Sequence, residues 1–205
     1  MSVELGFDAL QQEVDVPKDV VVATRKRRDV FGVVLSCADD VAKVRPSGSL
    51  KRGTHKDPLH DVDLIVIYSE DAHPQWAQPG SSAEEALLHT ASLAKELLGP
   101  DARQAEKVRL TRLQNHAVKC FLDDPDDPDA FTVDLTPALL RREGGFWIPQ
   151  RSDSMWVATN PQVLEDSVAG RHAAWRHFAK LVRVLKRWNA DNGEVMKSSS
   201  SRFSH

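Results

Sequence analysis

Two aspartates open the most apolar stretch of the sequence. Asp61 and Asp63 bracket Val62 at the start of the run DVDLIVIY, which is typical of a strand buried on both faces of a sheet. Side chains alternate along a strand, so the two carboxylates point to the same face. Two ionised carboxylates this close repel each other unless a cation or a shared proton compensates. Because oxygen ligands suit a hard ion such as Mg²⁺, the pair predicts a metal site.

A third carboxylate and a glycine-serine turn extend this candidate site. Asp134 lies within a later strand candidate, FTVDLT, which could run beside the first strand. Gly48 and Ser49 open a glycine-containing turn, and Ser49 lies twelve residues before Asp61. Their backbone N–H groups and the serine hydroxyl could hold phosphate groups. A phosphate site beside paired carboxylates indicates phosphoryl chemistry.

The hydrophobic pattern predicts the elements that must position these residues. Residues 17 to 38 have the spacing of a long helix, and Ser82 with Glu85 predicts a capping box at the start of a second helix. Runs of apolar and β-branched residues predict strands at 42–45, 61–68, 108–113, 117–122 and 131–136. The last three candidates follow one another closely, which favours an antiparallel meander.

The pattern changes after the last of these strands. Residues 143–162 predict an irregular aromatic segment, and a single long helix is then expected to carry Trp175, Phe178, Val182 and Leu185 on one face. The acidic stretch 123–129 lacks the central glycine and distal glutamate of a calcium loop, so it predicts a solvated hairpin tip.

Composition narrows the class of protein. The chain has 205 residues, 41% of them hydrophobic, which suits one domain, or one catalytic lobe with part of a second. A net charge of −3 argues against extended nucleic-acid binding. Cys37 and Cys120 lack disulfide or zinc spacing and are expected to be buried free thiols, while His55 and His60 are expected in solvent rather than on a metal. No signal peptide or membrane span is evident, which favours the cytoplasm.

Taken together, these segments resemble a known family. The run GSLKRGTHKDPLHDVDLIVIY resembles the signature of polymerase-β-type nucleotidyltransferases, and its GS followed by RGT is similar to the CD-NTases (cGAS/DncV-like enzymes) and the related oligoadenylate synthases. VDLTPAL resembles the strand of the family's third carboxylate. WIPQR and WVATNP resemble the segment between catalytic core and helical lobe, and LVRVLKRWN resembles the helix whose lysine, here Lys186, reaches the triphosphate.

The resemblance implies a fold and a domain division. The fold is α/β (α+β), with a polymerase-β-like core in which helices flank a mixed, mostly antiparallel sheet. Residues 1–150 would form the catalytic core and residues 151–205 the start of a helical lobe. The family usually continues for about another hundred residues, so we expect an incomplete C-terminal lobe in this chain, through truncation or reduction.

The resemblance also implies site residues and an activity. Asp61, Asp63 and Asp134 would ligate two Mg²⁺ ions, for which Mn²⁺ can substitute. Phosphate groups of a nucleoside triphosphate would contact the residues Gly48, Ser49, Lys186 and Ser198. The aromatic base-stacking residue that usually follows this serine is replaced by Ser199. The implied enzyme makes cyclic or linear oligonucleotides in antiphage (CBASS-type) signalling, with regulatory or effector proteins of a defence operon as partners.

Two other functions remain open from the sequence. The protein could transfer a nucleotide to RNA, a protein or a small molecule, a reading that a basic groove beside the carboxylates would favour. It could instead be a catalytically idle module that binds nucleoside triphosphates, which metal-dependent binding without pyrophosphate release would indicate.

Overall fold

The protein is built on one sheet of seven strands with helices around it. The structure is a computed structural model that describes residues 3–78 and 82–193. In chain order its elements are α1 (Val3–Val14), α2 (Lys18–Leu35), β1 (Val41–Ser47), α3 (Gly48–Arg52), β2 (Asp61–Tyr68), α4 (Ser82–Leu98), β3 (Leu110–Leu113), β4 (Val118–Phe121), β5 (Thr132–Leu140), β6 (Phe146–Gln150), a short 3₁₀ turn (Arg151–Asp153), β7 (Met155–Thr159), α5 (Pro161–Ala174) and α6 (Phe178–Asp191).

The sheet has one parallel pair at its centre. Its strand order is β1-β2-β5-β4-β3, and β5 continues into a second ladder with β6, which pairs with β7. Strands β2 and β5 are parallel, and every other pair is antiparallel. The expected mixed, mostly antiparallel sheet is therefore confirmed, and so is the meander of β3, β4 and β5.

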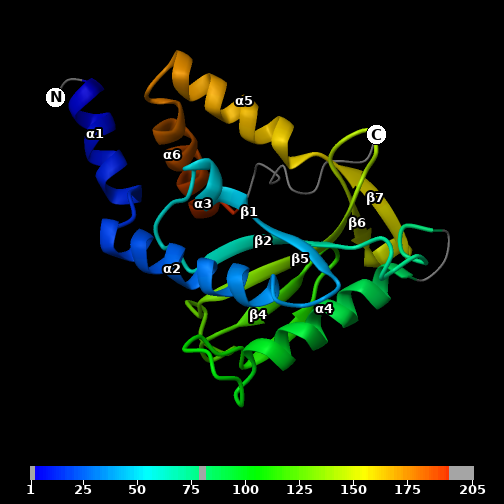
Figure 1. Ribbon diagram of the computed structural model, residues 1–205. Coiled ribbons are helices and arrows are strands. Elements are labelled where there is room, and N and C mark those ends of the chain that lie inside the picture. The colour runs from blue at the N-terminus through cyan, green and yellow to red at the C-terminus, as the bar shows by residue number, and fades with distance from the viewer. Residues whose placement is uncertain (1–2, 79–81, 194–205) are drawn as a thin grey trace.

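Helices α2 and α4 cover one face of this sheet (Figure 1). Alternation sends Val62, Leu64 and Val66 of β2 toward these helices, where they join one buried cluster with residues of α2, α4 and β5. Burial of such a cluster is the dominant favourable contribution to folding. The alternate positions of β2, including Asp61 and Asp63, consequently face the other side of the sheet.

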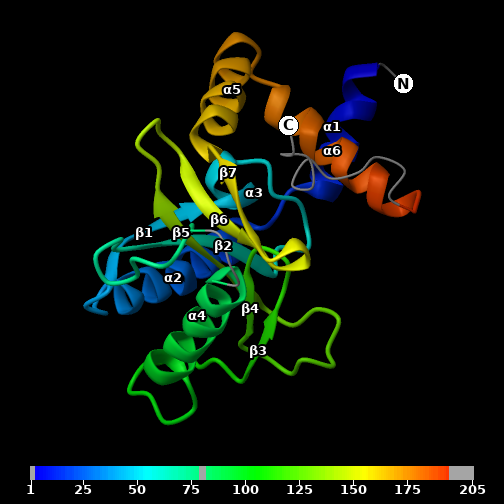
Figure 2. The same ribbon diagram turned by 90° about the vertical axis from the view of Figure 1, so that its right-hand side faces the viewer.

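The remaining helices lie together near the N-terminal end of β2. Figure 2 shows α1, α5 and α6 together on the side of the molecule that also holds α3. Helix α6 contacts both α1 and α5, and α3 packs on β1 and β2. The carboxylate-bearing face of the sheet thus lies next to α3 and the helices that follow the sheet in sequence.

Two sequence predictions for the C-terminal part are wrong. Residues 143–162 are not irregular, because β6 and β7 pair there as a hairpin, whose turn places Ser154 at a φ of 52°. The expected single helix is two helices, because Trp175 adopts extended backbone dihedrals that end α5. Pro149 interrupts the strand pattern of β6, which made this strand hard to predict. At Trp175 no glycine or proline is present that would have predicted the end of α5.

Other expectations are corrected in detail. Cys120 is buried as expected, but Cys37 is exposed just after α2. The carboxylate of Glu85 accepts hydrogen bonds from Gln75 and Trp76 rather than serving the expected capping box with Ser82, which itself accepts a bond from Trp156. Within the described residues, no helix is long and apolar enough to cross a membrane. The division at residue 150 stays a prediction.

Candidate active site

The pairing of β2 with β5 brings the three predicted carboxylates onto one face. In the parallel register Asp63 lies opposite Asp134, and Asp61 lies two positions earlier opposite Thr132. The intervening Val62 and its neighbour Val133 face the helices and are buried. Strand alternation therefore places Asp61, Asp63 and Asp134 together on the side away from α2 and α4.

Asp134 is half-buried, and one of its carboxylate oxygens accepts no hydrogen bond. Its Oδ1 atom is shielded from solvent without a hydrogen-bond partner, and the nearest cation, the Nζ of Lys119, is 3.7 Å away. Burial raises the pKa of Asp134 to about 6; Lys119 acts against the rise, and the charges of Asp63 and Asp61 add to it. A buried carboxylate oxygen without a partner is costly, so this site is suited to a cation.

Asp63 is held against the backbone of the glycine-serine turn. Burial raises the pKa of Asp63, and the charge of Asp61 raises it further. Gly48 has a φ of +70°, and a Cβ placed on it would lie 1.5 Å from Oδ2 of Asp63. Only glycine fits there, because any side chain would both strain the backbone and collide with the carboxylate.

Lys186 lies beside the same turn. Its ammonium donates a hydrogen bond to the backbone carbonyl of Thr54, with 3.0 Å between Nζ and O, just after α3. One turn earlier on α6, Arg183 donates to the carbonyl of Gly53. Burial lowers the pKa of Lys186 and Arg52 adds to this effect, while Asp61 and Asp63 oppose it. The lysine is thus held within electrostatic range of the carboxylate pair.

The donor set fits divalent cations of the magnesium type. All three predicted ligands are carboxylates, and burial, with their mutual repulsion, raises the pKa of two of them, so a cation between them would relieve an existing cost. Their oxygens do not all lie within 4.8 Å of one another. Among the described residues, a different group of three potential ligands does lie this close together. Ligands distributed over two ions, as expected from the sequence, need not converge on a single point.

The other predicted residues have mixed outcomes. Ser49 is half-buried in α3, and its carbonyl accepts a hydrogen bond from the backbone of Thr54. Ser198 lies outside the described residues. His55 and His60 are not simple solvent residues, because each is half-buried with a buried Nδ1 that has no partner. Neither belongs to a group of potential metal ligands among the described residues.

Sequence reasoning missed the basic residues around the carboxylates. Lys119 pairs with Asp134 across the β4–β5 ladder, and its position between the buried Val118 and Cys120 would have placed it on the correct face. Arg52 follows the glycine-serine turn and acts electrostatically on both Asp63 and Lys186. The sequence shows Arg52 within the GSLKRGT run, but the direction of its side chain depends on the helix α3, which was not predicted.

The fold is similar to that of several solved nucleotidyltransferase structures. CdnC of E. coli MS115-1, solved with ATP, superposes with a TM-score of 0.68 at 20% identity, over 92% of this chain and 58% of that one. The same protein is also solved in complex with HORMA-deltaN. The CdnE cyclic dinucleotide synthase of Elizabethkingia meningoseptica, solved with GTP and Apcpp, gives 0.64 at 15% identity, over 95% and 70%.

A protein from outside the Cdn group is also similar. In the GLD-2/RNP-8 complex the matched chain gives a TM-score of 0.59 at 13% identity, over 92% of this chain and 60% of that one. No family model and no curated protein matches the sequence.

These likenesses define the fold class. The chain has the polymerase-β-like nucleotidyltransferase fold that its sequence resemblance led us to expect, with a mixed sheet flanked by helices. It spans a little under three fifths of the length of the CdnC structure.

Proposed function

We propose that this protein is a metal-dependent nucleotidyltransferase that joins nucleoside triphosphates into cyclic or linear oligonucleotides and releases pyrophosphate. We propose further that it is a cytoplasmic enzyme and that it acts in antiphage signalling of the CBASS type. The observation that carries it is the register of β2 and β5, which sets Asp63, held against Gly48, opposite Asp134, whose shielded Oδ1 accepts no hydrogen bond.

The carboxylates would hold the catalytic metal. In this proposal Asp61 and Asp63 ligate both ions, and Asp134 ligates the ion nearer the attacking hydroxyl. Magnesium, or manganese in its place, would stabilise the entering and leaving oxygens of an in-line displacement at the α-phosphate. As the ligand nearest the attacking hydroxyl, Asp134 is also proposed to accept its proton.

Basic residues around the turn would hold the triphosphate. Lys186 already lies near the carboxylates and would bind the β and γ phosphates as a compact point charge. Ser49, and Ser198 beyond the described residues, are proposed to contact the same phosphates. Arg52 would add a second positive charge. Catalysis of this kind consists mainly of positioning and charge stabilisation.

A regulatory protein is the proposed partner besides the nucleotide. CdnC, whose fold this chain shares, is solved in complex with HORMA-deltaN. By analogy, we propose that a protein of a defence operon binds this enzyme and controls its turnover. Such a partner would be found by testing whether neighbouring gene products change pyrophosphate release.

A paired incubation tests the activity. The chain and its Asp61→Asn/Asp63→Asn variant are incubated with all four ribonucleoside triphosphates and Mg²⁺ or Mn²⁺. Pyrophosphate release is measured, and mass spectrometry identifies the products. Circular dichroism spectra confirm that the variant is folded, so that its loss of activity reports the site.

The outcomes separate the candidate functions. Pyrophosphate from the unmutated chain alone, with an oligonucleotide product mass, supports the proposal. Nucleotide found on added RNA, protein or a small molecule would instead show that the enzyme transfers a nucleotide to an acceptor. Metal-dependent nucleotide binding without turnover, in this chain and in a version extended by the C-terminal helices of CdnC, would indicate an idle module.

A further inference from the structure

A second group of polar side chains lies at the other end of β2. Asp40 precedes β1, His73 lies in the loop that follows β2, and His89 is in α4. One ligand atom from each of the three lies within 4.8 Å of the other two, and the described residues contain no other group of this kind. Strand β2 rises about 3.3 Å per residue, so the seven steps from Asp61 to Tyr68 separate this group from the candidate active site by about 23 Å.

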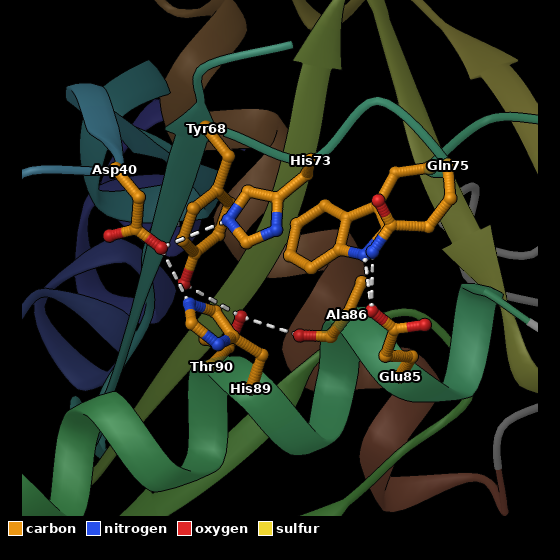
Figure 3. A network of polar contacts seen from close by, with 9 residues as sticks. Asp40, Tyr68, His73, Gln75, Glu85, Ala86, His89 and Thr90 are labelled. Atoms are coloured by element: carbon orange, nitrogen blue, oxygen red, sulfur yellow. Dashed lines mark hydrogen bonds and ion pairs between the residues drawn. The ribbon is translucent and has the colours of Figure 1, made fainter. Parts of the chain in front are cut away.

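The two imidazoles converge on one carboxylate oxygen. The Nε2 of His73 is 2.9 Å and the Nε2 of His89 is 2.6 Å from the same Oδ2 of Asp40 (Figure 3). All three side chains are partly enclosed, with exposed fractions of 22% for Asp40, 12% for His73 and 37% for His89. The most exposed of them, His89, leaves one side of the group open to solvent.

Aromatic packing fixes the direction of both rings. His73 stacks on Trp76 with 3.8 Å between ring centroids and an interplanar angle of 14°. Tyr68 meets each imidazole edge-on, with centroids 5.4 Å away in both cases. The hydroxyl of Tyr68 is itself bonded to Thr90, which donates to the carbonyl of Ala86 within α4. The nitrogens are therefore held toward Asp40 by groups that do not depend on the hydrogen bonds to it.

We propose that Asp40, His73 and His89 form a binding site for a zinc ion. Two imidazole nitrogens and one carboxylate oxygen are ligands that Zn²⁺ takes, with water completing a tetrahedron on the open side near His89. The ion takes the place of the two ring protons that otherwise lie between the nitrogens and Oδ2, and each ring then carries its proton on Nδ1. Nitrogen ligands disfavour Mg²⁺, so the site is distinct in metal preference from the carboxylates on the opposite face.

The site requires only a small adjustment to accept the ion. Two ligand atoms that each lie about 2.0 to 2.1 Å from a tetrahedral zinc are about 3.3 Å apart. The present separations of 2.9 and 2.6 Å must therefore increase by a few tenths of an ångström. The bound ion would fasten the turn before β1 and the loop after β2 to α4.

Cobalt binding tests the proposal directly. The test is made in the Asp61→Asn/Asp63→Asn background with excess Mg²⁺, so that the candidate active site does not contribute. Co²⁺ is titrated into the chelator-treated protein and followed by its visible absorption, and zinc retained after dialysis is counted per chain. The variants are His73→Ala, His89→Ala and Asp40→Asn, and His172→Ala removes an exposed histidine of α5 as the matched control.

The expected result is one tightly held ion per chain, with binding at least a hundredfold weaker in His89→Ala and unchanged in His172→Ala. Loss of even an outer hydrogen-bond partner of a metal ligand typically costs about 10- to 100-fold in affinity. Absence of a stoichiometric cobalt band, or a band that survives in His89→Ala, would overturn the proposal and leave a hydrogen-bonded cluster. If His73→Ala fails to fold, the exposed His89 and the near-isosteric Asp40→Asn still decide the question.

Discussion

The two ends of strand β2 hold carboxylates in opposite electrostatic settings. At its start, Asp63 and Asp134 are half-buried, and burial together with the charges of the neighbouring carboxylates raises the pKa of both despite the nearby cations. Beyond its far end, burial also acts to raise the pKa of Asp40, but the hydrogen bonds from His73 and His89 outweigh it and the pKa is lowered. The cations near Asp63 and Asp134 do not offset the effect of burial, whereas the two histidines beside Asp40 do.

This contrast separates a site that costs stability from one that contributes to it. Repelling carboxylates on a buried face destabilise the fold unless a ligand compensates, which is typical of functional sites. The cluster around Asp40 joins three chain segments through complementary groups. Substitutions at the two ends should therefore act on different measurable quantities.

The largest effect is expected for Asp63→Asn. Loss of one metal ligand removes several kcal/mol of transition-state stabilisation, or about a thousandfold in kcat/KM measured by pyrophosphate release. The melting temperature should not fall, because the substitution also removes a repelling charge. The control is Asp129→Asn in the acidic hairpin, which should leave both quantities unchanged. Retained activity in Asp63→Asn would contradict the assigned role.

Gly48→Ala should lose activity by about a hundredfold. The new Cβ would lie 1.5 Å from the Asp63 carboxylate and displace it, and misplacement of about 1 Å costs roughly that much in catalysis. Gly53→Ala is the matched control, because Gly53 also has a positive φ but a Cβ there would meet nothing within 4 Å. Thermal unfolding and pyrophosphate release are compared for the two.

Both glycine variants should lose about 1 kcal/mol or more of stability through backbone strain. Only Gly48→Ala should lose activity in addition. Equal activity in the two variants would mean that the contact with Asp63 does not matter for turnover.

A smaller effect is expected for Lys186→Met. Charge-assisted hydrogen bonds contribute about 1.5–3 kcal/mol, so its loss should lower kcat/KM by about 10- to 100-fold. The control, Arg187→Met, removes an exposed neighbour on α6 that pairs with Asp191. Steady-state kinetics for the nucleotide distinguish the two; an equal effect in both would assign Lys186 to helix packing.

The smallest effect concerns the pH dependence of stability at the far end. The folded pKa of Asp40 lies below its usual value of 3.8, so its contribution is present above that value and is lost as the pH falls through the folded pKa. Urea unfolding of the metal-free protein measures this contribution. At pH 6 the free energy of unfolding of the Asp40→Asn variant should be lower than that of the parent by no more than about 1 kcal/mol, since water partly screens Asp40 from the two histidines. That difference should shrink below pH 4; a constant one would contradict the assignment.

Local patterns predicted the strands and carboxylates well. The run from Asp61 to Tyr68 was placed with its observed bounds, because an apolar strand after a polar loop has a clear signal. Asp134 was expected on a strand that could lie beside it, and the parallel pairing of β2 with β5 confirms that placement. The hairpin at residues 146–159 was missed, since its short strands contain proline and a polar turn.

The sequence by itself determined how the carboxylates at the start of β2 are placed: alternation alone puts Asp61 and Asp63 on one face, where a cation or a shared proton would compensate their repulsion. Only the tertiary structure decided which groups surround them. The contact between Gly48 and Asp63, the reach of Lys186 to Thr54 and the meeting of Asp40, His73 and His89 all join residues far apart in the chain. Such contacts depend on helix packing and strand order, which short-range periodicity does not encode.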